Sequence, residues 1–179
     1  MTNLIVVSST VNLPNASVPA QQLLAFRLAQ EFFALPILQV QEIRGITPIT
    51  PIPNAPEHIR GVINLRGTIV PVIDLRTRFG LEQAVYDRFT VIIVVLIGTR
   101  VVGLVVDAVS DVLDVASSDI AAPPDLGARV DTSFLTGMIK RGDDIVLLLE
   151  LEQLLGLDTH LDTSDPTHDE LLPIQELKG

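Results

Sequence analysis

The residues that most often carry out chemistry are few in this chain and poorly grouped. It has three histidines, His58, His160 and His168, and no cysteine, which removes thiolate nucleophiles, disulfides and cysteine-based metal sites. His160 and His168 lie in an acidic segment that could form a loose metal site, but two solvated side chains are the simpler interpretation. His58 has no acid or nucleophile beside it, which favours a structural or surface role.

Three acids, Asp107, Asp111 and Asp114, follow the pattern D-x3-D-x2-D. A calcium loop requires a denser alternation of oxygen ligands and a glycine at its sharp turn, and neither is present. The phosphate-binding patterns G-x-x-x-x-G-K-[ST] and G-x-G-x-x-G and the nucleophile elbow G-x-S-x-G are also missing. We therefore expect no catalysis, no cofactor and no metal, with the three acids on the solvent side of a strand and its turn.

Two polar motifs remain, and each adjoins a predicted turn. VQEIRG at 40–45 places an acid and a base on either side of an apolar residue. GVINLRG at 61–67 precedes a predicted strand, where Gly67 suits a backbone turn with positive φ and Asn64 suits side-chain capping of that turn. Arg66 would then project from a rigid corner. From the residues alone, an arginine that forms a salt bridge at the turn is slightly favoured over a binding residue.

Composition indicates that strands position these motifs. The chain is 47% hydrophobic, lacks tryptophan and has seven Phe and Tyr residues in all, so Val, Ile and Leu must build the core, which favours strands. The longest apolar run, 91–97, is far shorter than the roughly 20 residues of a transmembrane helix. The net charge of −10 disfavours nucleic acid and anionic membranes as partners. We expect no direct membrane insertion, and the N-terminus does not resemble a signal peptide.

Periodicity and turn residues define the predicted elements. Prolines make 46–52 an edge strand or an extended loop, and Pro56 can begin a short helix over 57–63. A single helical turn is predicted at 76–79, ended by Gly80, and a short amphipathic helix at 150–155, ended by Gly156. A hairpin is predicted at 141–144. The remaining apolar runs are predicted strands, at 23–28, 32–40, 68–75, 90–97, 101–106, 109–115, 134–140 and 145–149.

The two halves of the chain resemble each other at fixed offsets. An offset of 69 aligns VQEI at 40–43 with VSDV at 109–112, and an offset of 76 gives seven identities across 61–81. We infer two copies of one β unit, at 22–89 and 90–157, joined face to face. Each copy alone is near the size at which a core becomes marginal, so the copies should share a hydrophobic seam. Residues 1–21 are predicted to be a flexible arm and 158–179 an acidic tail.

At these motifs the chain resembles the CheW family of chemotaxis adaptors. The resemblance rests on VQEIRG at 40–45, IRGVINLRGTIVPVIDLR at 59–76, RVVGLVVDAVSDVL at 100–113 and FLTGM at 134–138, and it covers about 23–157. It implies an all-β fold of two SH3-like five-stranded β-barrels packed around a shared hydrophobic core, with a few short helices. It also implies a non-catalytic adaptor, cytoplasmic and located at membrane-associated receptor arrays.

The implied partners are the regulatory domain of a CheA-type histidine kinase and the cytoplasmic tip of chemoreceptors, which is a helical hairpin. By resemblance, Arg66 matches the signalling arginine of the family and Gly61 a position near it. One side of the receptor groove would be formed by Val40, Glu42 and Ile43, and the second-barrel side by Val109 and Val112. The full expected binding set is Val40, Glu42, Ile43, Arg44, Gly61, Asn64, Arg66, Val109 and Val112.

Three alternatives stay open from the sequence. An adaptor of this family could equally serve type IV pilus twitching or phototaxis, since the arm and the tail fall outside the resemblance. A small β-barrel enzyme acting through Asp and Arg residues would need an acid–base constellation that the sequence does not display. A duplicated ligand-binding barrel would contain an interior cavity, whereas the family resemblance implies filled barrels.

Overall fold

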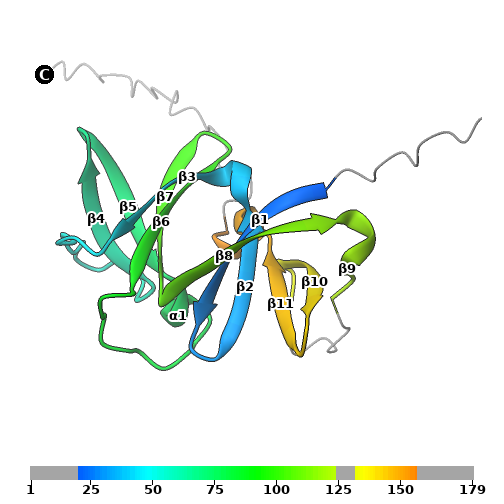
Figure 1. The fold of residues 1–179 in the computed structure, drawn as a ribbon. Helices are drawn as coiled ribbons and strands as arrows, with labels where there is room; N and C mark the ends of the chain where they lie inside the picture. The colour runs from blue at the N-terminus through cyan, green and yellow to red at the C-terminus, as the bar shows by residue number, and fades with distance from the viewer. Residues whose placement is uncertain (1–19, 124–131, 157–179) are drawn as a thin grey trace, which may run out of the picture.

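The computed structural model describes residues 20–123 and 132–156, and this part of the chain is mostly strand (Figure 1). The predicted tail, most of the predicted arm, His160 and His168 lie outside the described residues. The strands are β1 Ala20–Leu28, β2 Glu31–Pro36, β3 Val40–Gly45, β4 Ile59–Leu65, β5 Thr68–Asp74, β6 Val91–Ile97, β7 Arg100–Val106, β8 Ala108–Ala116, β9 Ile120–Ala121, β10 Leu135–Arg141 and β11 Asp144–Leu149. Short helices are α1 Leu75–Arg78 and α2 Leu151–Leu154, with 3-10 turns at Ile37–Gln39 and Ser117–Asp119.

The strands form two sheets, which lie side by side in Figure 1. One has the order β8-β1-β2-β11-β10-β9 and the other the order β3-β6-β7-β5-β4. Each sheet is closed by the chain that continues from its edge strand. After β8 the chain passes into β9, which pairs with β10, and after β3 it reaches Thr50, which pairs with Val62 of β4. The predicted all-β fold of two small barrels is confirmed.

Strand pairing cuts across the predicted boundary between residues 89 and 90. Strands β1 and β2 pair with β8 and β11, while β6 and β7 pair with β3 and β5. An offset of 76 nevertheless aligns β4 with β10 and α1 with α2. An offset of 69 places the whole of β3 within the longer strand β8. The six-stranded sheet therefore combines two strands of the first copy with four of the second, and the five-stranded sheet combines two strands of the second copy with three of the first. The two copies have exchanged their first two strands.

Burial of the exchanged strands on both faces explains this pairing. A cluster of buried residues lies between the sheets and includes Phe26, Phe33, Ile93 and Leu104. Separate clusters fill the two barrels, one around Ile92, Val94 and Val105 and the other around Leu23, Ala34 and Leu148. In β6, alternate side chains thus enter the barrel and the shared core, which is why 91–97 is a continuous apolar run. The expected shared seam is confirmed, and the barrel interiors are packed with these side chains.

Local structure was largely predictable, with two errors. The strand predicted over 32–40 is wrong in its second half, because β2 ends at Pro36 and a 3-10 turn follows at Ile37–Gln39. Gly80 and Gly156, whose φ angles are +67° and +61°, follow the last residues of α1 and α2 by two positions, and β10 and β11 form the predicted hairpin. The predicted helix over 57–63 is wrong, because this segment is strand β4 after a single turn in which the Ile59 amide donates to the Pro56 carbonyl. Its burial alternates with a period of two, and that pattern outweighs the preference of proline for a helix start.

Gly61 makes possible the closure of the barrel that β3, β6, β7, β5 and β4 form. Its φ is +139°, and a Cβ at this position would lie 2.0 Å from the Thr50 carbonyl oxygen. The backbones of Thr50 and Val62 exchange hydrogen bonds of 2.9 and 2.8 Å beside it. Gly137, the counterpart of Gly61 in the second copy, is equally crowded, since its Cβ would lie 2.3 Å from a methyl group of Ile120. Both glycines permit a crossing chain to approach β4 or β10.

Substitution of Gly61 should therefore destabilise the fold. We expect Gly61→Ala to lower the free energy of unfolding by more than about 2 kcal/mol, because the new methyl group displaces the Thr50 segment and strains the backbone. Gly45→Ala is the matched control, since its Cβ meets no atom within 4 Å, and it should stay within about 1 kcal/mol of wild type. Urea unfolding measures both, and equal stabilities for the two variants would refute the closure role of Gly61.

The connection between β5 and β6 is held by a buried acid and a tyrosine. Asp74 is 5% exposed, and its Oδ1 accepts from the amides of Arg76 and Thr77 at the start of α1. Its Oδ2 accepts a 2.7 Å hydrogen bond from the Tyr86 hydroxyl. Burial, followed by the hydrogen bond to Asp74, raises the pKa of Tyr86 well above its ordinary value. The phenol must stay protonated for this contact to persist.

Tyr86 can be titrated directly because it is the only tyrosine of a chain without tryptophan. Because the pKa of Tyr86 is higher in the folded state than in the unfolded state, where it is about 10, the contact stabilises the fold fully below pH 10. This stabilisation is lost as the pH rises through the folded-state pKa. We expect the phenolate absorbance of the native protein to develop above pH 10, and closer to pH 10 in Asp74→Asn. Circular dichroism must show that the fold persists, and a native midpoint at or below pH 10 would contradict the assignment.

Candidate functional site

Strand β3 carries the first group of predicted binding residues along the edge of its sheet. It pairs with β6 alone, and a bulge at Gln41 interrupts their register between Val40 and Glu42. Val40 packs against the shared core, whereas Ile43 is 43% exposed. An edge strand with an exposed β-branched residue and unpaired backbone groups is a ready surface for another chain.

Glu42 joins β3 to the tip of the β4–β5 hairpin. Its Oε2 lies 2.6 Å from Nη2 of Arg66, and its Oε1 lies 3.6 Å from Nη1 of Arg44. The Arg66 side chain is 76% exposed, compared with 25% for Glu42. The Nε of Arg44 is buried without a hydrogen-bond partner. These three residues, which the sequence separates by up to 24 positions, form one charged cluster whose outer member faces solvent.

The hairpin turn fixes where Arg66 leaves the backbone. Arg66 and Gly67 have φ angles of +50° and +88°, as a two-residue type I′ turn requires at both central positions. The Oδ1 of Asn64 accepts a 2.8 Å hydrogen bond from the Gly67 amide. The predicted cap and the predicted salt-bridged turn arginine are both present. Gly61 and Asn64 therefore have structural roles, whatever they contribute to binding.

Strand β8 carries the remaining predicted residues on the edge of the other sheet. Val109 packs against the shared core, and Val112 is 46% exposed. The offset of 69 aligns these residues with Val40 and Ile43, so each copy presents one core-packed and one exposed residue at the same two positions. No hydrogen bond or ion pair joins this pair to the Glu42 cluster among the described residues.

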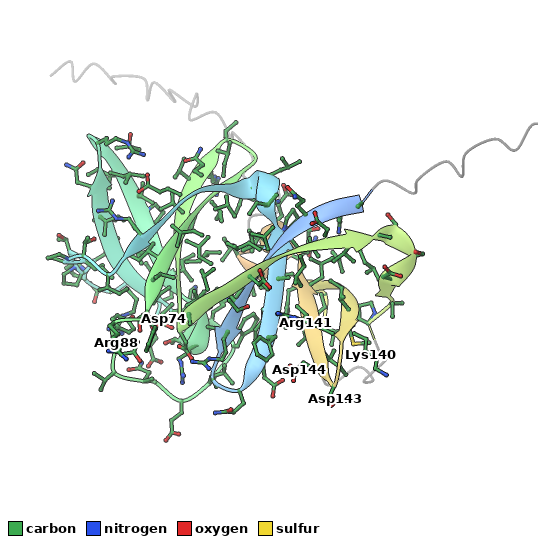
Figure 2. The ribbon with its side chains drawn as sticks, in the orientation of Figure 1. Asp74, Arg88, Lys140, Arg141, Asp143 and Asp144 are labelled. Atoms are coloured by element: carbon green, nitrogen blue, oxygen red, sulfur yellow. The ribbon has the colours of Figure 1, made fainter. Side chains whose placement is uncertain are left out.

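The structure adds a charged pair that the sequence did not assign to the site. Asp111, which the offset aligns with Glu42, lies 3.2 Å from Nη2 of Arg141. Arg141 stands at the base of the β10–β11 turn, where Figure 2 places it near Asp143 and Asp144. Both edge strands thus have an acid that meets an arginine of the neighbouring hairpin. The alignment of 40–43 with 109–112 was the signal that could have identified Asp111.

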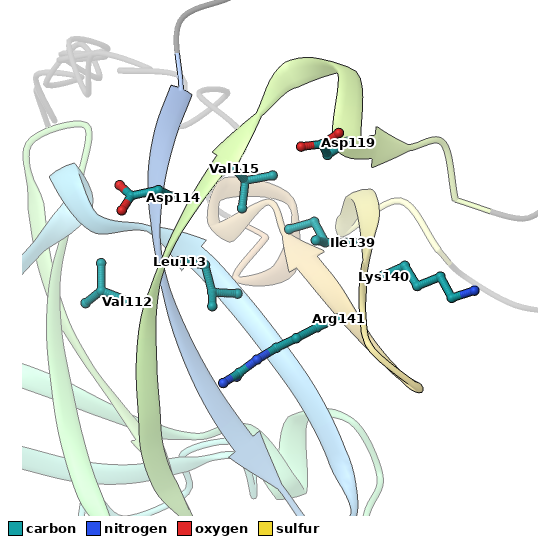
Figure 3. Close-up of a pocket in the computed structure, with 8 residues that line it drawn as sticks. All are labelled: Val112, Leu113, Asp114, Val115, Asp119, Ile139, Lys140 and Arg141. Carbon is teal, nitrogen blue, oxygen red and sulfur yellow. The ribbon is translucent and has the colours of Figure 1, made fainter.

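Beside this second pair lies a groove of about 460 Å³ between β8 and β10. Figure 3 shows Arg141 extending from β10 toward β8, with Lys140 directed away from it. The groove is lined by both aliphatic and charged side chains, which include Val112, Leu113, Asp119, Ile139 and Arg141. It provides a shallow contact surface next to an edge strand.

The other acids that the sequence analysis considered, Asp107 and Asp114, bond to different residues and do not form one group. The Asp107 carboxylate accepts from Arg76 Nε at 2.6 Å and from the Ala29 amide at 2.7 Å, whereas Asp114 accepts from Gln22 at 2.9 Å. Within 20–123 and 132–156, no three His, Asp or Glu side chains are grouped so that they could hold a metal ion. No helix in the described part of the chain is long and apolar enough to cross a membrane.

The fold and the site define a double β-barrel with an edge strand on each sheet that exposes one apolar side chain, Ile43 on β3 and Val112 on β8. Residues 22–158 match the family described as CheW-like domain. The chain is 46% identical over 136 residues to the chemotaxis protein CheW of Klebsiella aerogenes, covering 76% of this chain and 82% of that protein. It is 30% identical over 139 residues to protein FrzA of Myxococcus xanthus, covering 76% and 86%.

A solved structure agrees with these relatives. The crystal structure of scaffolding protein TtCheW from Thermoanaerobacter tengcongensis matches with a TM-score of 0.70 and 38% identity, covering 75% of this chain and 92% of that one. The chain therefore belongs to the CheW-like domain family, and its fold and relatives make it a chemotaxis adaptor.

Proposed function

We propose that this chain is a non-catalytic adaptor that couples the cytoplasmic tip of chemoreceptors to the regulatory domain of a CheA-type histidine kinase. The observation that carries the proposal is the exposure of Ile43 and Val112 at equivalent positions of two edge strands, each beside an acid–arginine pair. Such a surface suits docking, because apolar contacts supply affinity while the charged pairs select orientation.

The proposed receptor contact uses the apolar residues of both edges. Val40 and Val109 anchor the edge strands in the shared core, and Ile43 and Val112 point out of it. A receptor helix would place its apolar face against these residues, in the manner of a helix in a groove. Each contact can be weak, because receptor clusters and kinase dimers supply multivalency.

Arg66 is the proposed signalling residue. It is held by Glu42 on a rigid turn, yet its side chain is mostly exposed. An exposed pair of this kind contributes little to folding, so its guanidinium can exchange Glu42 for a partner acid at small cost. Gly61, Asn64 and Arg44 support this corner, and we propose that the kinase is reached through it.

We also propose that the protein acts in the cytoplasm at membrane-associated receptor arrays, where both partners are found. The relatives named chemotaxis protein CheW favour chemotaxis over type IV pilus twitching or phototaxis. The ligand-binding barrel is disfavoured, because aliphatic side chains fill both barrels in the described residues.

The receptor contact predicts a specific loss of binding. We expect Ile43→Asp and Val112→Asp each to weaken binding to a chemoreceptor cytoplasmic fragment at least about tenfold, because each places an unpaired carboxylate in an apolar contact. The control is Val85→Asp, which changes a residue that is 94% exposed in the connection between α1 and β6. Titration by isothermal calorimetry measures the affinities. Wild-type affinity in both edge variants would reject the proposed groove.

The proposed role of Arg66 predicts a variant that keeps its folding stability but loses signalling. We expect Arg66→Ala to change the free energy of unfolding by less than about 1 kcal/mol, as for an exposed ion pair, while receptor-dependent kinase activation is lost. The control, Arg88→Ala, removes an arginine that stacks on Phe89 outside the site and should leave activation intact. Urea unfolding and autophosphorylation in reconstituted complexes give the two readouts. Normal activation by Arg66→Ala would exclude the signalling role.

A further inference from the structure

A row of aromatic rings fills one side of the seam between the sheets. The ring centroids of Phe33 and Phe79 lie 5.2 Å apart with nearly parallel planes, and those of Phe79 and Phe134 also lie 5.2 Å apart. Phe33 lies on β2, Phe79 follows α1, and Phe134 precedes β10. Stacked or tilted ring pairs at these separations make favourable contacts beyond the apolar area that they bury.

The equivalent place in the other half of the molecule is not filled. The repeat offsets carry Phe33, Phe79 and Phe134 onto Val102, Leu155 and His58. All three of these smaller residues line a groove of about 370 Å³, together with Ile59, Ile73 and Arg100. The groove is thus the volume that three phenyl rings occupy in the partner half, and its walls are mainly aliphatic. Its position is at the base of the β4–β5 hairpin, opposite the turn that carries Arg66.

We propose that this groove is the docking site of the chain's own segment Leu171-Leu172-Pro173-Ile174. The segment belongs to residues 157–179, which lie outside the described part of the chain. Leu155 is itself a wall of the groove, and the described chain ends one residue later at Gly156. Fourteen residues lie between Gly156 and Leu171, a length that can span up to about 50 Å when extended. The tether also maintains an effective concentration in the millimolar range.

Charge supports the same occupant. His58 and Arg100 stand among the aliphatic walls, and residues 158–179 carry six acids and one lysine. Asp169, Glu170 and Glu176 flank the apolar segment closely, so a docked segment would bring carboxylates to the guanidinium of Arg100. The N-terminal arm is a poorer match, because residues 1–20 carry no charged side chain and the chain enters β1 at Ala20, beside β8 of the other sheet.

The absence of cysteine allows a test in the full chain. A nitroxide attached at Gln175→Cys should broaden the amide resonances of Val101, Val102 and Ile73 more than those of their counterparts Phe32, Phe33 and Leu149. Adding Leu171→Asp and Leu172→Asp should abolish this selective broadening. Leu155→Phe, which restores the ring that position 79 holds in the other half, should also abolish it by filling the groove.

Leu4→Asp with Ile5→Asp is the control, because it alters the apolar run of the N-terminal arm and should leave the broadening unchanged. Signal dispersion in the same spectra reports whether each variant is folded. Broadening that is absent, uniform over both sheets, retained after Leu171→Asp and Leu172→Asp, or lost in the arm variant would overturn the proposal. The proposal does not depend on the adaptor function, since none of these measurements includes a receptor or a kinase.

Discussion

The burial of β1, β2, β6 and β7 on both of their faces is the constraint on which the rest of the molecule depends. These strands place side chains such as Phe26 and Ile93 in the shared core, while residues such as Leu23 and Ile92 fill the barrels. Because each copy contributes its first two strands to the sheet of the other, neither sheet can form from one copy alone. The strand exchange therefore makes the two barrels one cooperative unit and fixes the relative position of the edges β3 and β8.

Features that depend on residues close in the sequence could be predicted, whereas pairings between distant segments could not. Strand periodicity, the glycine-ended turns of α1 and α2, and the Asn64 cap depend on neighbours and were predicted. The pairing of β1 with β8 depends on contacts about 90 residues apart, and two tandem copies suggest separate barrels unless tertiary packing is known. The error at 57–63 had a local cause, because Pro56 favours a helix start while the decisive pairing of Val62 is with Thr50.

The sequence named candidate site residues, but it could not predict which of their side chains lie in contact. The sequence indicated a turn arginine that forms a salt bridge, yet it could not name Glu42 as its partner, since side-chain distances depend on barrel closure. Arg141 was missed because it occupies the position that aligns with Leu65, one residue before the counterpart of Arg66. The two halves thus place an acid–arginine pair at equivalent edges through different hairpin positions. The two edges therefore have similar charged pairs although the arginines do not occupy aligned sequence positions.

The departures from the repeat are where the two halves differ in structure. The strand framework keeps the same order in both sheets, and even the bulges fall at equivalent sites, between Ile59 and Gly61 in β4 and between Leu135 and Gly137 in β10. Against this constant framework, Phe33 and Phe79 close the seam on one side, whereas Val102 and Leu155 leave it open on the other. A duplicated scaffold with equal halves would bind two identical partners. Unequal seams and unequal hairpin tips give this scaffold a direction, which an adaptor between two different proteins requires.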